Sequence, residues 1–357
     1  MSNLESSQGL PEGHYRRVVD AWAMYDWANS AFTVTILTAV FPVYYRSLVT
    51  SAGGGPEDAT AYWAYTTSLS ILVIAALGPV LGAIADIVSA KKRFLGVALI
   101  CGVLGSASLA LLGEGTFVVA SCLFAIANLG FAGGNIFYEA LLPHIARPND
   151  FDRVSVRGYA FGYLGGGLFL VFCFILILRP EWFWMANQDS ALRASFVGVA
   201  VWWFVFSLPL FFNIEDARYA ERASISLHVV RDGWQRLVNT VGQVRRYRQL
   251  TLFLAAFWLY NDGIGTIIKL AAAYGDEIGI RRNDLLTALI LTQFILSVFR
   301  ARSASAGSHD ILGLSGRFLR VSRSTLLCRS PGFLSELPGI FTCWRWSLAW
   351  SRVGRRR

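Results

Sequence analysis

Charged residues are scarce in this sequence. Asp, Glu, Lys and Arg make up 15% of the 357 residues, hydrophobic residues make up 55%, and the mean hydropathy is +0.48. A soluble domain of this size needs far more polar surface to cover its core, so the composition excludes a soluble globular fold.

Several functional motifs are also absent. The five cysteines have no CxxC spacing, no Asp-Asp pair occurs, and none of the three lysines follows a glycine as a phosphate-binding loop requires. We therefore expect no metal site, no cofactor, no ATP-driven step and no enzymatic activity. Residues 1–20 are polar, which predicts no cleavable signal peptide.

The net charge of +9 is confined to one segment. Residues 300–357 hold 11 Arg and two acids, Asp310 and Glu336, whereas residues 1–299 hold equal numbers of basic and acidic residues. The main part of the chain is thus neutral, which argues against a nucleic-acid partner.

The apolar runs predict an all-α polytopic membrane protein. A spanning helix needs about 20 mostly apolar residues, and its backbone must be satisfied internally. Eight segments qualify or nearly do: 25–48, 62–85, 94–113, 117–142, 158–178, 194–213, 250–272 and 285–299. With the N-terminus inside, the inner connections carry 15 Lys and Arg and the outer ones carry five. The positive-inside rule therefore predicts a cytosolic N-terminus, and we expect the plasma (inner) membrane.

Five parts follow from these runs: a cytosolic N-terminus (1–24), a six-helix bundle (25–213), a linker (214–249), the start of a second bundle (250–299) and a basic tail (300–357). The linker has apolar residues at helical spacing, which fits a helix on the cytosolic interface or a solvated helix. The Arg- and Ser-rich tail begins within a helix, and this favours a shifted reading frame over a disordered tail.

Polar residues inside spans are functional candidates because they are costly in lipid. Asp26 and Asn29 share a face of the first span, and Asn128, Asn135 and Glu139 form a stripe along the fourth. The alternatives are an interfacial capping carboxylate for Asp26 and interhelical hydrogen bonds for the stripe.

The seventh span carries Asn261, Asp262 and Lys269. Asp262 and Lys269 share a face but lie about 10 Å apart along the axis, so they need other partners or water. They are candidates for a substrate or proton site, with a structural ion pair as the alternative. In the fifth span Gly158, Gly162 and Gly166 repeat every four residues, a pattern typical of close helix packing.

The connection between the second and third spans carries Gly82, Asp86, Lys91, Lys92 and Arg93. It resembles the cytosolic signature loop of the major facilitator superfamily. The runs Tyr25–Phe32, Phe137–Pro143, Ser155–Gly167 and Leu259–Gly263 more specifically resemble the vacuole-effluxer-like branch of that superfamily. Eukaryotic members of this branch export amino acids from vacuoles.

The resemblance implies a fold of two six-helix halves, of which this chain supplies the first half and about two helices of the second. It also implies a gating role for the signature loop, and Glu139 departs from it by standing where the branch has an amide. We expect a secondary transporter that moves a small solute, amino acids among the candidates, with a proton as the coupling ion. The rival hypotheses are a truncated, non-transporting membrane scaffold and a membrane-embedded transferase.

Overall fold

The computed structural model describes residues 11–88, 91–214, 235, 238–239, 242, 247–277 and 279–305. Within these residues all regular structure is helical. The elements are α2 (Glu12–Phe32), η1 (Thr33–Ala39), α3 (Phe41–Ser51), α4 (Pro56–Val88), α5 (Lys91–Ser108), η2 (Leu109–Leu111), α6 (Phe117–Ile145), η3 (Pro148–Asp150), α7 (Phe151–Leu178), η4 (Pro180–Phe183), α8 (Gln188–Asn213), α10 (Arg248–Glu277) and α11 (Arg282–Ser305).

Six helices of the described part are long and apolar enough to cross a membrane, and a seventh span results if the bent first pair is counted. The prediction of an all-α polytopic membrane protein is therefore confirmed. The expected eighth span is also a helix, α11, but its apolar part covers only Thr287–Leu296. Nearly all of the predicted linker and the tail beyond Ser305 lie outside the described residues.

The first span differs from its apolar run in two ways. It begins at Glu12 instead of residue 25, because its polar first turns make ion pairs, including one between Arg147 and Glu12. It also changes to a π-helix, η1, and bends by 41° before α3. Pro42 has no N–H to continue the helical hydrogen bonds, and the Val40 amide bonds five residues back to the Thr35 carbonyl.

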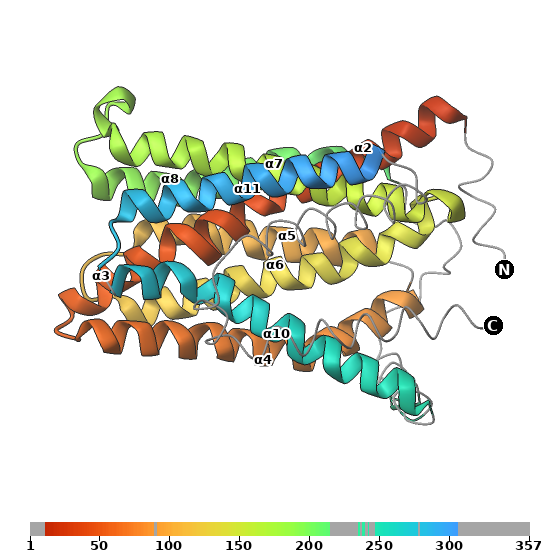
Figure 1. The fold of residues 1–357 in the computed structure, drawn as a ribbon, viewed down its shortest axis with the longest axis horizontal. Coiled ribbons are helices and arrows are strands. Elements are labelled where there is room, and N and C mark those ends of the chain that lie inside the picture. The colour runs from red at the N-terminus through yellow and green to blue at the C-terminus, as the bar shows by residue number, and fades with distance from the viewer. Residues whose placement is uncertain are drawn as a thin grey trace, which may run out of the picture. The chain divides into compact units, whose positions relative to one another are not determined.

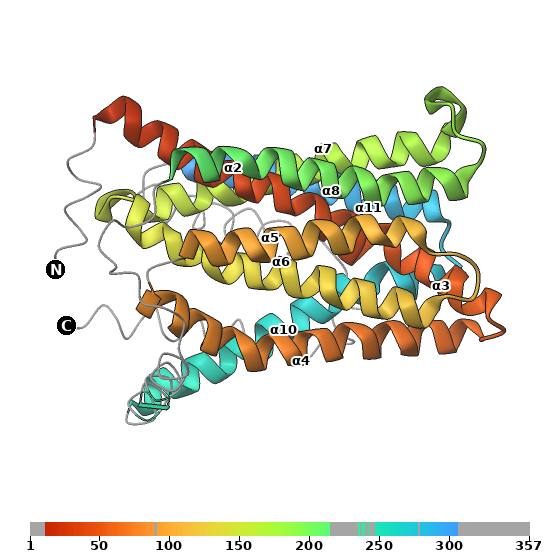
Figure 2. The same cartoon turned by 180° about the vertical axis from the view of Figure 1, so that it is seen from behind.

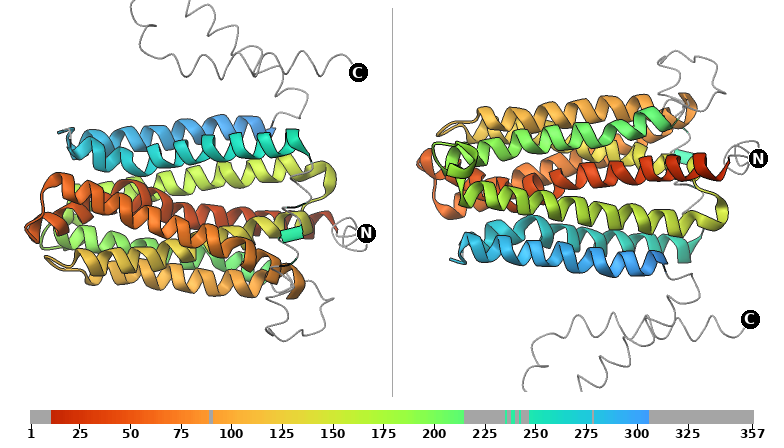
Figure 3. Two further views of the ribbon diagram at one scale, coloured as in Figure 1. Left: turned by 90° about the horizontal axis from the view of Figure 1, so that it is seen from below. Right: turned by 90° about the horizontal axis from the view of Figure 1, so that it is seen from above.

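The long helices run side by side (Figures 1 and 2). α2 packs against α7 and α8, α5 packs against α6 and α8, and α4 packs against α6. α11 lies along α7, on the side away from α2 (Figure 3). We name the two ends of the bundle by residues: the Glu12 end also holds Arg147 and Ile214, and the Ser51 end also holds Leu112 and Arg193.

Two apolar clusters fill the bundle. Toward the Ser51 end Phe41, Trp63, Phe124 and Phe196 are almost fully buried, with the Phe41 and Phe124 rings stacked at 5.7 Å. Toward the Glu12 end the core contains Trp22, Tyr138 and Leu142. Many large apolar side chains on the outside of the bundle are exposed, which suits a surface in contact with lipid.

Glycines permit the closest helix contact, between α5 and α6. A Cβ on Gly105 would stand 2.8 Å from the Ala127 backbone nitrogen, and one on Gly130 would collide with the backbone of Gly102. The two backbones therefore touch, as small residues allow in membrane bundles.

We predict that Gly105→Val destabilises the protein by about 1–3 kcal/mol, because the added side chain has to push the two backbones apart. Thermal unfolding of the full chain in detergent measures this change. Gly265→Val in α10 is the matched control, since no atom beyond its chain neighbours and its own helix backbone lies within 4 Å of an added Cβ. Equal unfolding temperatures for Gly105→Val and the parent would contradict the packing argument.

Candidate functional site

Polar residues predicted on the first and fourth spans meet between α2 and α6. The Asn29 side-chain amide donates a hydrogen bond to the Asn135 side-chain oxygen at 2.7 Å. Asn29 is buried and Asn135 is half-buried. This bond joins two different spans inside a bundle that is otherwise mainly apolar.

Asp26 lies one turn before Asn29 and faces α7. A Cβ on Gly162 would stand 2.9 Å from the Asp26 carboxylate oxygen and 2.8 Å from the Ser30 hydroxyl oxygen. The carboxylate therefore lies within the contact between α2 and α7, one helical turn from the Asn29–Asn135 bond.

All three glycines of the predicted packing repeat lie against α2. A Cβ on Gly158 would stand 2.6 Å from the Trp22 ring, and one on Gly166 would stand 3.2 Å from the Ser30 Cβ. Together with Gly162 they bring α7 close enough to hold the polar side chains of α2.

An aromatic stack borders this polar region toward the Glu12 end. The Tyr138 ring stacks on Trp22 at 4.4 Å and on Tyr25 at 4.9 Å, and the Trp22 indole N–H donates to the Tyr138 carbonyl at 3.2 Å. The Tyr138 hydroxyl is buried and makes no hydrogen bond within the described part of the chain. A buried hydroxyl in this state is a ready donor for a ligand or a water molecule.

The remaining members of the predicted stripe on α6 have different environments. Asn128 is buried, whereas Glu139 is exposed and adjoins Ala140, whose carbonyl accepts a hydrogen bond from Lys91. The stripe thus runs along α6 from the buried Asn128 toward Glu139 at the Glu12 end, and Asn135 lies between these two residues.

The candidate residues on α10 make no contact with Asn29 or Asn135 among the hydrogen bonds and ion pairs of the described residues. Asn261 and Asp262 are exposed, and no atom lies within 4 Å of a Cβ placed on Gly263. Lys269 belongs to α10, but its side chain lies outside the described part.

The signature loop is held at the Glu12 end. Lys91 donates to the Ala140 carbonyl at 3.4 Å, and Lys92 donates to the Ile214 carbonyl at 2.6 Å, at the C-terminus of α8. A lysine at a helix C-terminus satisfies an orphan carbonyl and complements the helix dipole. A Cβ added to Gly82 would stand 3.9 Å from the Ile136 side chain. The Arg93 side chain is exposed. The side chain of Asp86 lies outside the described part.

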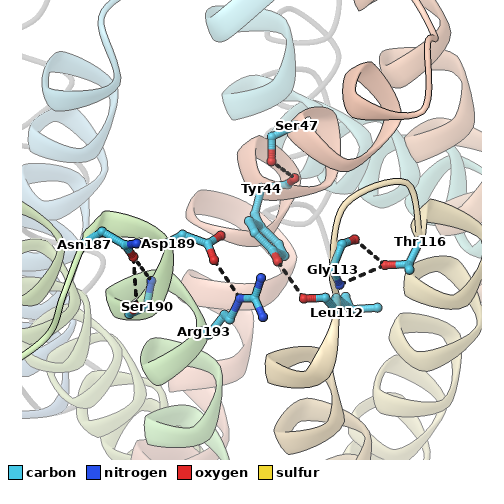
Figure 4. A network of polar contacts seen from close by, with 9 residues as sticks. All are labelled: Tyr44, Ser47, Leu112, Gly113, Thr116, Asn187, Asp189, Ser190 and Arg193. Atoms are coloured by element: carbon cyan, nitrogen blue, oxygen red, sulfur yellow. Dashed lines mark hydrogen bonds and ion pairs between the residues drawn. The ribbon is translucent and has the colours of Figure 1, made fainter.

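A second polar network joins the connections at the Ser51 end (Figure 4). The Tyr44 hydroxyl donates to the Leu112 carbonyl at 3.3 Å, and Arg193 pairs with Asp189 at 2.8 Å. The Gly115 amide donates to the Ser51 hydroxyl at 3.0 Å. The bonds from Tyr44 and to Ser51 fix α3 against the connection between α5 and α6, whereas the Arg193–Asp189 pair lies within α8.

Sequence reasoning missed the aromatic stack and the π-helix. Tyr25 and Tyr138 are adjacent in the sequence to Asp26 and Glu139 and lie in the runs that resemble the family, whereas Trp22 lies one helical turn before Asp26. The π-helix has a weaker signal in Pro42, which predicts a break without specifying its form.

Comparison with known proteins gives a consistent result. The profile of the family described as "Vacuole effluxer Atg22 like" matches residues 14–315. The uncharacterized MFS-type transporter YxiO of Bacillus subtilis is 34% identical over 281 residues, which are 78% of this chain and 65% of that protein.

Autophagy-related protein 22 of Eremothecium gossypii is 22% identical over 323 residues, covering 77% of this chain and 62% of the relative. The chain thus spans less than two thirds of the length of these relatives. No solved structure matches. The profile match and the similarity to YxiO show that the chain belongs to the Atg22-like vacuole effluxer family.

Proposed function

We propose that this protein is built to move a small solute across a membrane by alternating access, as a secondary transporter of the permease or efflux type. The observation that carries the proposal is the Asn29–Asn135 bond beside Asp26, inside the spans of α2 and α6. Polar groups inside a span are energetically costly, and they usually mark a pathway for solute or ions. Substrate sites of secondary transporters lie near the membrane midplane.

The proposed solute class is amino acids. The cluster offers one carboxylate, two amides and the unpartnered Tyr138 hydroxyl. A carboxylate suits an ammonium group, and amide and hydroxyl donors suit a carboxylate, so the set fits a zwitterion. Asp26 is also the proposed proton carrier. Protonation makes its carboxyl group neutral, and a neutral group can pass between the two sides of the membrane at a lower cost than a charged one.

The proposed motion rocks the second half of the fold against the first. α10 packs on η1 and α3, and α11 packs on α7 and η1, so both helices of the second half touch the bent part of the first span. We assign the gating role to the signature loop, Gly82 to Arg93, at the Glu12 end. The excess of Lys and Arg in the connections at that end supports a cytosolic N-terminus in a plasma (inner) membrane.

A non-transporting membrane protein is the second candidate. It is favoured by the exposed face of α10, where Asp262 and several aromatic residues have no cover from the described helices.

We predict that amino-acid uptake into proteoliposomes responds to an imposed pH gradient and that Asp26→Asn removes the response. The amide keeps the size of the side chain but cannot take up and release a proton. Uptake of a labelled amino-acid mixture, with and without the gradient, is the measurement. Glu181→Gln, an exposed acid at the Ser51 end, is the matched control. Uptake indifferent to the gradient in the parent protein would refute proton coupling.

The Asn29–Asn135 bond has its own test. We predict that Asn135→Ala lowers the free energy of unfolding by about 1 kcal/mol and that the double replacement with Asn29→Ala costs little more, because both remove one bond. Uptake falls at least tenfold in each variant if the pair also contacts the solute. Additive stability losses would show that the two amides do not act on each other.

Asp262 distinguishes a transporter from a scaffold. Because this side chain is exposed, we predict that Asp262→Asn leaves the unfolding temperature unchanged and abolishes uptake. Asp284→Asn, an exposed acid on α11, is the control and keeps uptake. If Asp262→Asn transports as well as the parent, Asp262 is not part of the pathway. If the parent itself shows no uptake, the scaffold candidate is favoured.

A further inference from the structure

A charged groove at the Glu12 end lies outside the proposed transport site. Its volume is about 910 Å³, and its lining comes from the first turns of α2, the connection between α6 and α7, and the first turns of α7. Phe161 of the lining packs on Trp27, which stacks on Trp202 of α8. Neither Asn29 nor Asn135 belongs to the lining of the groove.

The acids of the groove already have partners. Glu12 pairs with Arg147 at 3.0 Å, Asp20 pairs with Arg157 at 2.6 Å, and Asp150 accepts a hydrogen bond from the Tyr15 hydroxyl at 3.1 Å. The lining holds three acids and four arginines. It thus has one positive charge in excess.

Arg153 is the arginine of the lining that makes no ion pair among the described residues, whereas Arg16 and Arg147 share Glu12. Arg153 is exposed in the groove, and no hydrogen bond or ion pair links it to any described residue. Arg157 also keeps free N–H donors, because one guanidinium offers five and its pair with Asp20 uses a single nitrogen. The two arginines are one helical turn apart on α7, so both guanidinium groups can reach one phosphate.

An apolar stripe continues from these arginines along α7. Phe161, Leu164, Leu168 and Phe172 follow Arg157 at intervals of three or four residues and share its face. Leu164, Leu168 and Phe172 are 38%, 43% and 42% exposed. Gly162 instead faces α2 and Gly167 faces α11, so beyond Phe161, which packs on Trp27, neither of these two helices covers the stripe.

The dimensions of the stripe match one half of a bilayer. Leu168 lies about 16 Å along the helix from Arg157. The hydrocarbon layer of one leaflet is about 15 Å deep. A headgroup at the arginines thus places an acyl chain over Leu164 and Leu168.

We propose that the groove and the stripe bind one anionic phospholipid, with its phosphate on Arg153 and Arg157 and an acyl chain along Leu164 and Leu168. The single excess charge of the lining complements a monoanionic headgroup such as phosphatidylglycerol. The proposal rests on the membrane location of the chain and is independent of whether it transports a solute.

The test is native mass spectrometry of the full chain in detergent, titrated with phosphatidylglycerol or with phosphatidylcholine of the same acyl chains. We expect the anionic lipid to bind more tightly and Arg153→Gln to weaken it about fivefold, since one surface arginine contributes about 1 kcal/mol to such binding. Arg153 has no hydrogen-bond or ion-pair partner among the described residues, so we expect the variant to keep its unfolding temperature. Arg281→Gln, an exposed arginine at the Ser51 end, is the control and binds like the parent.

A second variant examines the acyl chain. Leu168→Gln weakens binding of both lipids, because it places an amide against the chain. Equal affinity for the two headgroups, or an equal loss in Arg281→Gln and Arg153→Gln, would overturn the proposal. Displacement of the lipid by millimolar inorganic phosphate or glycerol phosphate would show that a soluble anion is the ligand instead.

Discussion

The hydrogen-bond requirement of buried polar groups in an apolar medium organises this bundle. Within the spans, Ser70, Ser106 and Ser195 donate to carbonyls of their own helices, four residues back. Such bonds satisfy the hydroxyl groups within their own helix, so no partner on a neighbouring helix is needed. Asn29 and Asn135 instead bond across two spans, as Thr66 of α4 and Ser121 of α6 also do. Because polar groups are costly inside spans, the amide pair is the place where we propose that the solute binds.

Glycine residues let the helices pack closely around these polar side chains. α7 approaches α2 closely at Gly158, Gly162 and Gly166, so Asp26 and Ser30 lie against a backbone and not against a methyl group. On the other side, Gly130 and Gly134 let α6 lie against α5 and the Tyr25 hydroxyl. The span that carries Asn135 is thus fixed by its glycine face while its polar face meets α2. Gly130 faces α5, whereas Gly134 and Asn135 both face α2, so α6 is held from two sides.

The sequence was sufficient for the spans and for the polar stripe, because both depend on spacing within one helix. Asn29 and Asn135 could be named as candidates, but their mutual bond depends on how α2 and α6 pack, which no local pattern encodes. The same holds for the Trp22–Tyr138–Tyr25 stack and for the salt bridges that extend the first helix back to Glu12. Asp262 illustrates the converse. It was a strong candidate by its place in a span, yet the described helices leave it exposed.

The bend at η1 connects the packing to the proposed motion. At the Glu12 end the ion pairs Glu12–Arg147 and Asp20–Arg157 tie α2 to its neighbours, and at the Ser51 end Tyr44 ties α3 to Leu112. Both ends of the first span are therefore fixed within the first half. Between them η1 has π-helical hydrogen bonds, a geometry frequent at functional sites, and it is the part that α10 and α11 both touch. In the proposed motion, the second half therefore acts on the least regular turn of a span whose two ends are held, about one turn from Asn29.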